Sequence, residues 1–66
     1  MDQLGPIGKV KYVGTYYKVM FEHGSTYDLL SIENGPFGEG YRVYSPVFED
    51  DGLFPKSEFE VVELFA

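Results

Sequence analysis

The chain has no cysteine, no tryptophan and a single histidine among its 66 residues. Without cysteine no disulfide can hold the fold, and a structural zinc site, which needs about four nitrogen or sulfur ligands, is nearly excluded. A domain this short buries only about 60% of the surface that its unfolded chain exposes. Stability must therefore come from apolar packing and backbone pairing within a single domain, residues 1–66, whose ends at 1–6 and 65–66 we expect to fray.

Long apolar runs and basic residues are also scarce. No stretch approaches the ~18 apolar residues of a membrane span, and no signal peptide is recognisable, so we expect a cytoplasmic protein with no membrane contact. Residues 1–20 carry a charge of +3 − 1 = +2, whereas residues 21–66 carry 2 − 10 = −8. Most of the surface would repel a polyanion, so direct nucleic-acid binding is not expected. A partner protein with a basic face fits this charge better.

Aromatic residues, by contrast, are abundant, with six phenylalanines and six tyrosines. Each ring can bury about 150–250 Å², so twelve rings exceed what the core of so small a domain needs. Tyrosine suits the surface because its ring can be half covered while its hydroxyl stays wet. We therefore expect some rings to face outward as a binding surface, although they could also merely cover a thin core.

Glycine and proline, twelve together, interrupt the chain every few residues. Between them lie short runs of β-branched and aromatic residues, which are typical of strands. The predicted strands are 7–13, 26–33, 41–45, 53–54 and 60–64. Residues 15–21 fit either a further strand or the arm of a long loop. The alternation within 26–33 changes face, which predicts a bulge near Leu29 or burial of both faces.

Turn signals separate these runs. Asn34-Gly35 is a strong turn signal because both residues tolerate positive φ, and residues 36–40 prolong it into a loop. The acidic segment 49–52 predicts a tight turn with Gly52 in the left-handed conformation. Pro55 ends a short strand and opens a single 3₁₀ turn before the last strand.

About five short antiparallel strands, with one 3₁₀ turn before the last, predict an all-β protein. We expect the sheet to close into a small barrel, because closure removes the exposed edges of a lone sheet. If the first and last strands pair, Lys9 and Lys11 lie near acidic residues of the C-terminal segment, namely Glu58, Glu60 or Glu63.

Residues 52–64 resemble the C-terminal end of SH3 domains. Gly52-Leu53-Phe54-Pro55 precedes a polar segment, an aromatic residue and a valine, with one residue more than the usual spacing. The resemblance implies an SH3-like barrel with an aromatic groove for proline-rich peptides. Pro55 and Phe59 would border this groove, with Tyr16 or Tyr17 opposite. The tryptophan pair and the Ala-Leu-Tyr-Asp-Tyr motif of that family are absent here.

A second resemblance covers most of the chain. From Lys9 to Glu63 the sequence is similar to small uncharacterised bacterial proteins, some of them associated with phage or prophage. The shared segments are Gly24-Ser25-Thr26-Tyr27-Asp28, Tyr41-Arg42-Val43 and Phe59-Glu60-Val61-Val62-Glu63. This resemblance implies a fold and leaves the function open.

Catalytic and metal-binding patterns are weak. His23 lies near Glu22 and Ser25, but three neighbours in one turn rarely form the rigid geometry of a catalytic triad. The acidic run Glu49-Asp50-Asp51 lacks the spaced ligand series of a calcium loop. We therefore expect no enzyme, no metal and no cofactor.

Two functional hypotheses follow. The first is a protein-interaction module that docks on a basic partner or on itself, with a phage-type inhibitor of a host protein as one version. Its candidate binding residues are Tyr16, Tyr17, Phe37, Tyr44, Pro55 and Phe59. The second is a small-ligand binder or sponge with a pocket in the barrel mouth or at an oligomer interface. The sequence does not define the partner or the oligomeric state.

Overall fold

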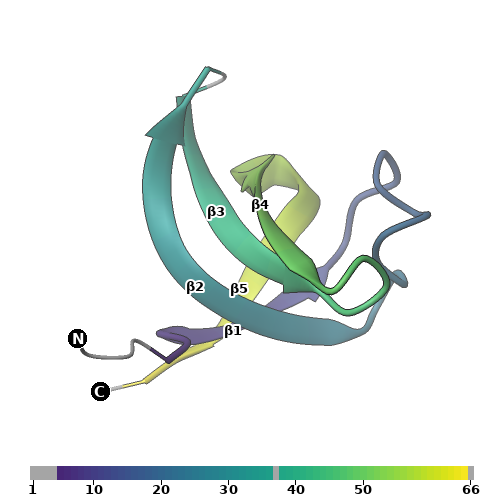
Figure 1. Ribbon diagram of the computed structural model, residues 1–66, viewed down its shortest axis with the longest axis horizontal. Helices are drawn as coiled ribbons and strands as arrows, with labels where there is room; N and C mark the ends of the chain where they lie inside the picture. Colours follow the sequence, from purple (N-terminus) through teal and green to yellow (C-terminus); the bar gives the residue numbers. More distant parts are fainter. Residues whose placement is uncertain (1–4, 37, 66) are drawn as a thin grey trace.

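A computed structural model describes residues 5–36 and 38–65 and shows an all-β chain (Figure 1). Its elements are β1 (Gly8–Tyr12), β2 (Thr26–Gly35), β3 (Gly38–Ser45), β4 (Asp50–Pro55), a 3₁₀ turn η1 (Lys56–Glu58) and β5 (Phe59–Leu64). The predicted strands and the 3₁₀ turn before the last one are confirmed. Residues 13–25, the long loop, form turns and no strand. Within the described ranges, no helix has the length and hydrophobicity needed to cross a membrane.

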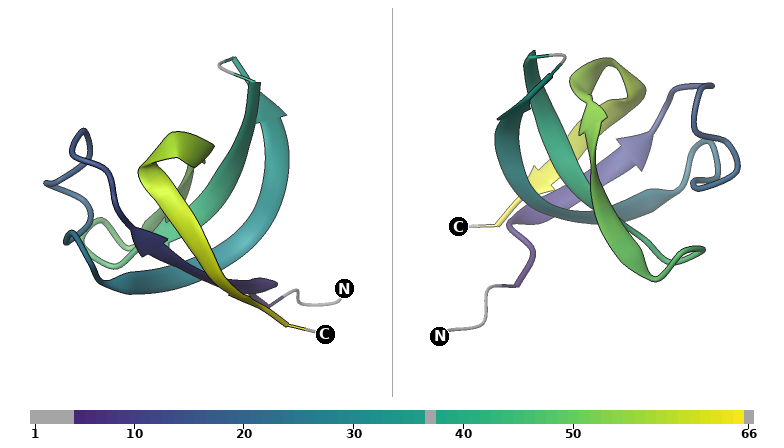
Figure 2. Two further views of the ribbon diagram at one scale, coloured as in Figure 1. Left: turned by 180° about the vertical axis from the view of Figure 1, so that it is seen from behind. Right: turned by 45° about the horizontal axis from the view of Figure 1, so that its top comes forward.

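The five strands form one antiparallel sheet in the order β4-β3-β2-β1-β5. The first and last strands do pair, the condition on which the charge contacts were predicted, and Lys9 lies opposite Glu63 and Lys11 opposite Glu60. The sheet curves strongly, as the three views show (Figures 1 and 2). The predicted closure into a barrel is not confirmed, because β4 and β5 are the two edges and do not pair. β4 ends at Pro55, which has no N–H to donate and leads directly into η1.

Both predicted turns lie two or three residues from their expected positions. Asn34 and Gly35 belong to β2, where Gly35 pairs with Gly38, so the turn begins after Gly35, at Pro36. Pro36 explains the shift, because a residue without an N–H fits a turn better than a ladder. Most of the expected loop 36–40 is therefore strand.

The second turn links β3 to β4 through residues 46–49. Glu49, and not Gly52, has the positive φ of this turn, at 55°. Gly52 lies within β4, where a Cβ would come within 3.1 Å of the Phe54 ring. The bulge predicted near Leu29 is confirmed by a register shift between Leu29 and Ser31.

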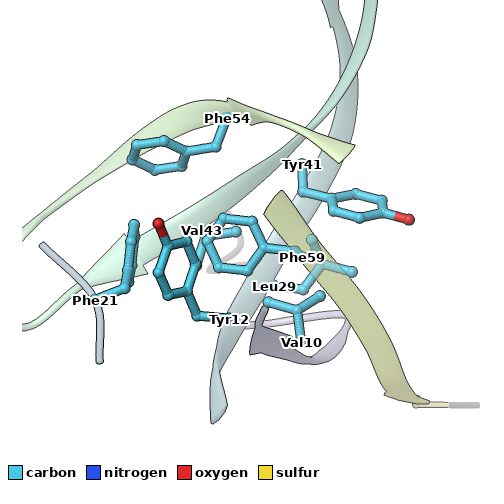
Figure 3. Close-up of a cluster of buried hydrophobic side chains, with 8 residues drawn as sticks. All are labelled: Val10, Tyr12, Phe21, Leu29, Tyr41, Val43, Phe54 and Phe59. Carbon is cyan, nitrogen blue, oxygen red and sulfur yellow. The ribbon is translucent and has the colours of Figure 1, made fainter. Parts of the chain in front are cut away.

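The core lies on the concave side of the sheet and is largely aromatic (Figure 3). Its buried residues are Val10, Tyr12, Phe21, Leu29, Tyr41, Val43, Phe54 and Phe59. Phe21 comes from the long loop, and its ring stands nearly perpendicular to Phe54 and Phe59, with centroids 5.0 and 5.1 Å away. Such aromatic pairs contribute about 0.5–1.5 kcal/mol beyond area burial. The long loop is therefore held by the core itself.

Candidate functional site

The base of the long loop is fixed by the side chain of Glu58, which follows β4 in η1. The Tyr12 hydroxyl donates a hydrogen bond to Glu58 Oε1 over 2.9 Å, and the backbone N–H of Tyr16 donates to the same oxygen over 3.0 Å. The Tyr12 oxygen in turn accepts the backbone N–H of Tyr17, 2.6 Å away. Two loop residues are thus tied to β1 and η1 by one phenol and one carboxylate.

Gly14 makes room for this carboxylate. A Cβ at Gly14 would lie 2.1 Å from Glu58 Oε1, so a side chain there would displace the acid. The Glu58 carbonyl also accepts the backbone N–H groups of Val13 and Gly14, at 2.9 and 3.1 Å. Burial raises the pKa of the Tyr12 phenol, and its hydrogen bond to Glu58 raises that pKa as well. Tyr12 therefore stays protonated and donates this bond at neutral pH.

The far side of the loop is held against the end of β3. The backbone N–H groups of Met20 and Phe21 both donate to the Tyr17 carbonyl over 3.0 Å. The Ser45 hydroxyl donates to the Met20 carbonyl over 3.2 Å. Figures 1 and 2 accordingly show the long loop and the β3–β4 turn at the same end of the molecule.

Large apolar side chains stand exposed at this end. Tyr16 and Val19 on the long loop are 80% and 78% exposed, and Val47 and Phe48 on the β3–β4 turn are 63% and 55% exposed. We call these four residues the loop-end surface. Among the described residues, Leu64 is the one other large apolar side chain that is more than half exposed. Clustered exposed apolar residues mark interaction sites more often than scattered ones do.

The charge around the loop-end surface is acidic. The long loop and residues 46–51 together carry Lys18 against Glu22, Glu49, Asp50 and Asp51, and with Arg42, which binds Asp51 over 2.9 Å, the sum is 2 − 4 = −2. All four acids lie in exposed positions. An apolar centre with a charged rim is the usual anatomy of a protein interface, in which the rim charges select the partner and speed association.

The neighbouring outer face of the sheet carries an ion-pair network centred on Arg42. Its guanidinium donates to both carboxylate oxygens of Glu33, at 2.7 and 3.0 Å, and to Asp51 at 2.9 Å. These bonds and the Ser31 hydroxyl lower the pKa of Glu33 to about 2. Tyr44 lies two residues beyond Arg42 on β3, opposite Asp51, and is 36% exposed. This network pins β2, β3 and β4 to one another.

The structure brings some of the predicted site residues together and separates others. Tyr16 and Tyr17 pack edge to face, with ring centroids 4.9 Å apart, and Tyr17 packs in the same way on Phe54, beside the half-buried Pro55. Tyr44 lies on the outer face of β3. Phe59 is 5% exposed, so its ring serves the core and offers no contact area. Phe37 lies outside the described residues.

Four residues of this region are absent from the sequence prediction: Val19, Val47, Phe48 and Glu58. Val47 and Phe48 lie between Pro46 and three acidic residues. This pattern could have indicated a turn before the predicted one at residues 49–52. Val19 carries no such signal, because its exposure depends on Phe21 being the residue that enters the core. Glu58 lies 46 positions from Tyr12, and no local pattern links the two.

Metal binding and catalysis have little support in the described residues. Across residues 5–36 and 38–65, no group of three or more His, Cys, Asp or Glu side chains could hold a metal ion, and no pocket opens. His23 is exposed, and the Ser25 hydroxyl lies 3.5 Å from Glu22 Oε1. No protein-family model, curated protein or solved structure matches this chain significantly.

Proposed function

We propose that this protein is a non-catalytic binding module that docks through its loop-end surface on a partner protein with a basic face. The observation that carries the proposal is the exposure of Tyr16, Val19, Val47 and Phe48 on two segments joined by the Ser45–Met20 hydrogen bond. Exposed rings on a fixed backbone can be buried by a partner at little cost in conformational entropy. An inhibitor of a host protein, of the kind phages encode, would be one instance of such a module.

An SH3-like fold is part of this proposal. The strand order, with β1 between β2 and β5, and the 3₁₀ turn ahead of β5 support it. The site we propose differs from the groove that the resemblance implies, because Phe59 is buried and the exposed residues extend to the β3–β4 turn. We therefore do not carry proline-rich peptide binding over to this chain.

Site-directed photocrosslinking tests the proposal. A photoreactive phenylalanine analogue replaces Tyr16 in the full chain, and the same analogue at Leu64, which is 59% exposed, serves as the control. In a lysate of the source organism, we expect adducts with one protein from position 16 and none with that protein from position 64. Excess unlabelled wild type should compete the adduct away.

The double variant Tyr16→Ala/Phe48→Ala measures how much these two rings contribute to binding. It should fail to compete for the adduct and should bind the purified partner about 10- to 1,000-fold more weakly, the range of hot-spot truncations. Added salt should weaken wild-type binding, because the rim is acidic. Equal adducts from both positions, or full competition by the double variant, would rule the loop-end surface out.

A further inference from the structure

Ser45 ends β3 with a hydroxyl where the strand otherwise presents large side chains to the core. Tyr41, Val43 and Ser45 alternate along β3, so all three side chains point to the inner face, and Ser45 is only 1% exposed. Apart from the tyrosines of the core, it is the one buried polar side chain in the described part of the chain. Burying a hydroxyl costs free energy unless it finds a hydrogen-bond partner. The partner of this hydroxyl therefore indicates its role.

The partner is a backbone carbonyl of the long loop. The Ser45 hydroxyl donates to the Met20 carbonyl over 3.2 Å, across 25 positions of sequence. Met20 lies between Val19, which is exposed on the loop-end surface, and Phe21, which is buried in the core. On the other side of the bond, Ser45 lies two residues ahead of the exposed Val47. One hydrogen bond thus connects the bases of the two halves of the loop-end surface.

No second hydrogen bond joins these two halves in the part of the chain that the structure describes. The other hydrogen bonds of the long loop stay within the loop or go to Tyr12, Tyr27 and Glu58. The loop's aromatic contacts with the rest of the fold are to rings on β1, β2, β4 and β5, and among the described residues none is to the β3–β4 turn. Ser45 therefore provides the one directional link between the long loop and the turn.

The β3–β4 turn also has a backbone conformation that needs support. Glu49 has a φ of 55°, in the left-handed region that residues with a Cβ rarely adopt. Such a residue persists where the surrounding structure determines its conformation. Val47 and Phe48 are mostly exposed, so they give the turn little support through burial. The β3–β4 ladder and the Ser45 hydrogen bond remain as the features that hold the turn in place.

We propose that Ser45 is a positioning residue of the loop-end surface: its hydroxyl holds the β3–β4 turn against the long loop, so that a partner meets both halves as one preformed surface. This inference rests on the proposed function and deepens it. A surface that is ordered before binding loses less conformational entropy when the partner arrives. Without the hydroxyl, the Met20 carbonyl loses its acceptor role and the two halves can move independently. Binding should then weaken although every residue of the surface is still present.

A spin label tests the positioning without any partner. The chain has no cysteine, so Val47→Cys supplies a single attachment site for a nitroxide on the turn. The label should broaden the NMR amide signals of residues 16–20, and Ser45→Ala should reduce this broadening because the turn no longer stays against the loop. Ser45→Thr keeps the hydroxyl and should restore the broadening. Ser31→Ala removes another donating hydroxyl, on β2, and is the matched control that should leave the broadening unchanged.

Ser45→Cys replaces the threonine variant if the melting curve shows that the added methyl is not accommodated. Its weak S–H donor should give a broadening between those of wild type and Ser45→Ala. Unchanged broadening in Ser45→Ala, or the same loss in Ser31→Ala, would overturn the inference.

Competition measures the consequence for binding. In the photocrosslinking experiment above, Ser45→Ala should need about 3- to 10-fold more protein than wild type to suppress the position-16 adduct, the range for one lost hydrogen bond. Ser45→Thr and Ser31→Ala should compete like wild type. Full competition by Ser45→Ala would show that binding does not need the preformed surface, and would overturn the inference. If no adduct forms, the proposed function fails, while the spin label still decides whether Ser45 positions the turn.

Discussion

The long loop and strand β5 both present apolar side chains to solvent, but they are built in opposite ways. The loop does not pair with any strand of the sheet. It is held by Phe21, which is buried in the core, and by the hydrogen bonds of Glu58 at its base. β5 is held by a ladder to β1 that contains one bulge, and no strand of the described residues pairs with its other edge. The loop can therefore recognise a partner through side chains, and β5 through backbone groups.

Their charges also differ, and this separates the two surfaces experimentally. The loop end is acidic, whereas β1 and β5 are balanced. A complex with a basic partner at the loop end should therefore weaken as salt is added.

Phe21→Ala should have the largest effect, because it breaks the support of the loop. Phe21 is buried and packs against Tyr12, Phe54 and Phe59. Truncating a buried phenylalanine costs about 3–5 kcal/mol of unfolding free energy, a large part of the stability of so small a domain. Urea unfolding measures this loss. Phe48→Ala removes an exposed ring nearby and serves as the control, with an expected change within about 0.5 kcal/mol.

A pair of glycine substitutions compares the two regions directly. A Cβ at Gly8 would lie 2.3 Å from the Glu63 carbonyl oxygen, whereas a Cβ at Gly14 would meet the Glu58 carboxylate. A backbone oxygen cannot move aside without disturbing the β1–β5 ladder, so Gly8→Ala should cost about 1–3 kcal/mol. Gly14→Ala can instead push out a side chain and should cost less, about the value of the hydrogen bonds lost.

The two variants should also differ in where the structure loosens. Hydrogen exchange should show faster exchange along β5 in Gly8→Ala, and at Tyr16 and Tyr17 in Gly14→Ala. If both variants loosened the same amides, the long loop and β5 would form one cooperative unit, and the comparison drawn above would fail.

Glu58→Ala should release the base of the loop without touching β5. It leaves the Tyr12 hydroxyl and the Tyr16 N–H without their acceptor, which should cost about 1–2 kcal/mol. Amide exchange at Tyr16 and Tyr17 should accelerate, and binding through the loop-end surface should weaken with it. Glu63→Ala, on β5, is the matched control and should leave these amides unchanged. Unchanged exchange in Glu58→Ala would show that Phe21 alone orders the loop.

Local patterns were sufficient to predict the strands and the 3₁₀ turn after Pro55, whereas the pairing of the first and last strands was only a condition for the predicted charge contacts. The two turns were misplaced because Asn34-Gly35 and Gly52 tolerate a turn but do not require one. Pro36 limits strand pairing after Gly35, and Glu49 has the positive φ of the second turn. Barrel closure was predicted from the general cost of open sheet edges. That argument does not take into account that β4 ends at Pro55.

The candidate site was predicted only in part, for a similar reason. Tyr16 and Tyr17 could be recognised as surplus rings, but Phe59 could not be distinguished from them by its residue type. Its burial follows from its contacts with Phe54 on β4 and with Phe21, which lies far away in the sequence and enters the core from the long loop. The Glu58 anchor likewise depends on a contact between distant segments.

Glu33→Gln should have the smallest effect of these variants, and its difference from wild type should be present at neutral pH and disappear in acid. The pKa of Glu33 is lowered from 4.5 to about 2 by Arg42 and Ser31. Its contribution to stability is therefore complete above about pH 4.5 and disappears as the pH falls toward 2. The urea midpoint of wild type should fall more steeply over this window than that of Glu33→Gln. Glu63→Gln, which removes a carboxylate remote from Arg42 in the ladder, should follow wild type.

This acid response also tests whether the two regions rest on the same support. The Glu33–Arg42 pair joins β2 to β3, and β2 carries both the end of the long loop and the ladder to β1. Below pH 4, amides of the loop and of β5 should therefore lose protection together in wild type, unlike the separate effects of Glu58→Ala and Gly8→Ala. Loss confined to one region would show that β2 does not couple them, and parallel midpoint curves for wild type and Glu33→Gln would remove the pair from this role.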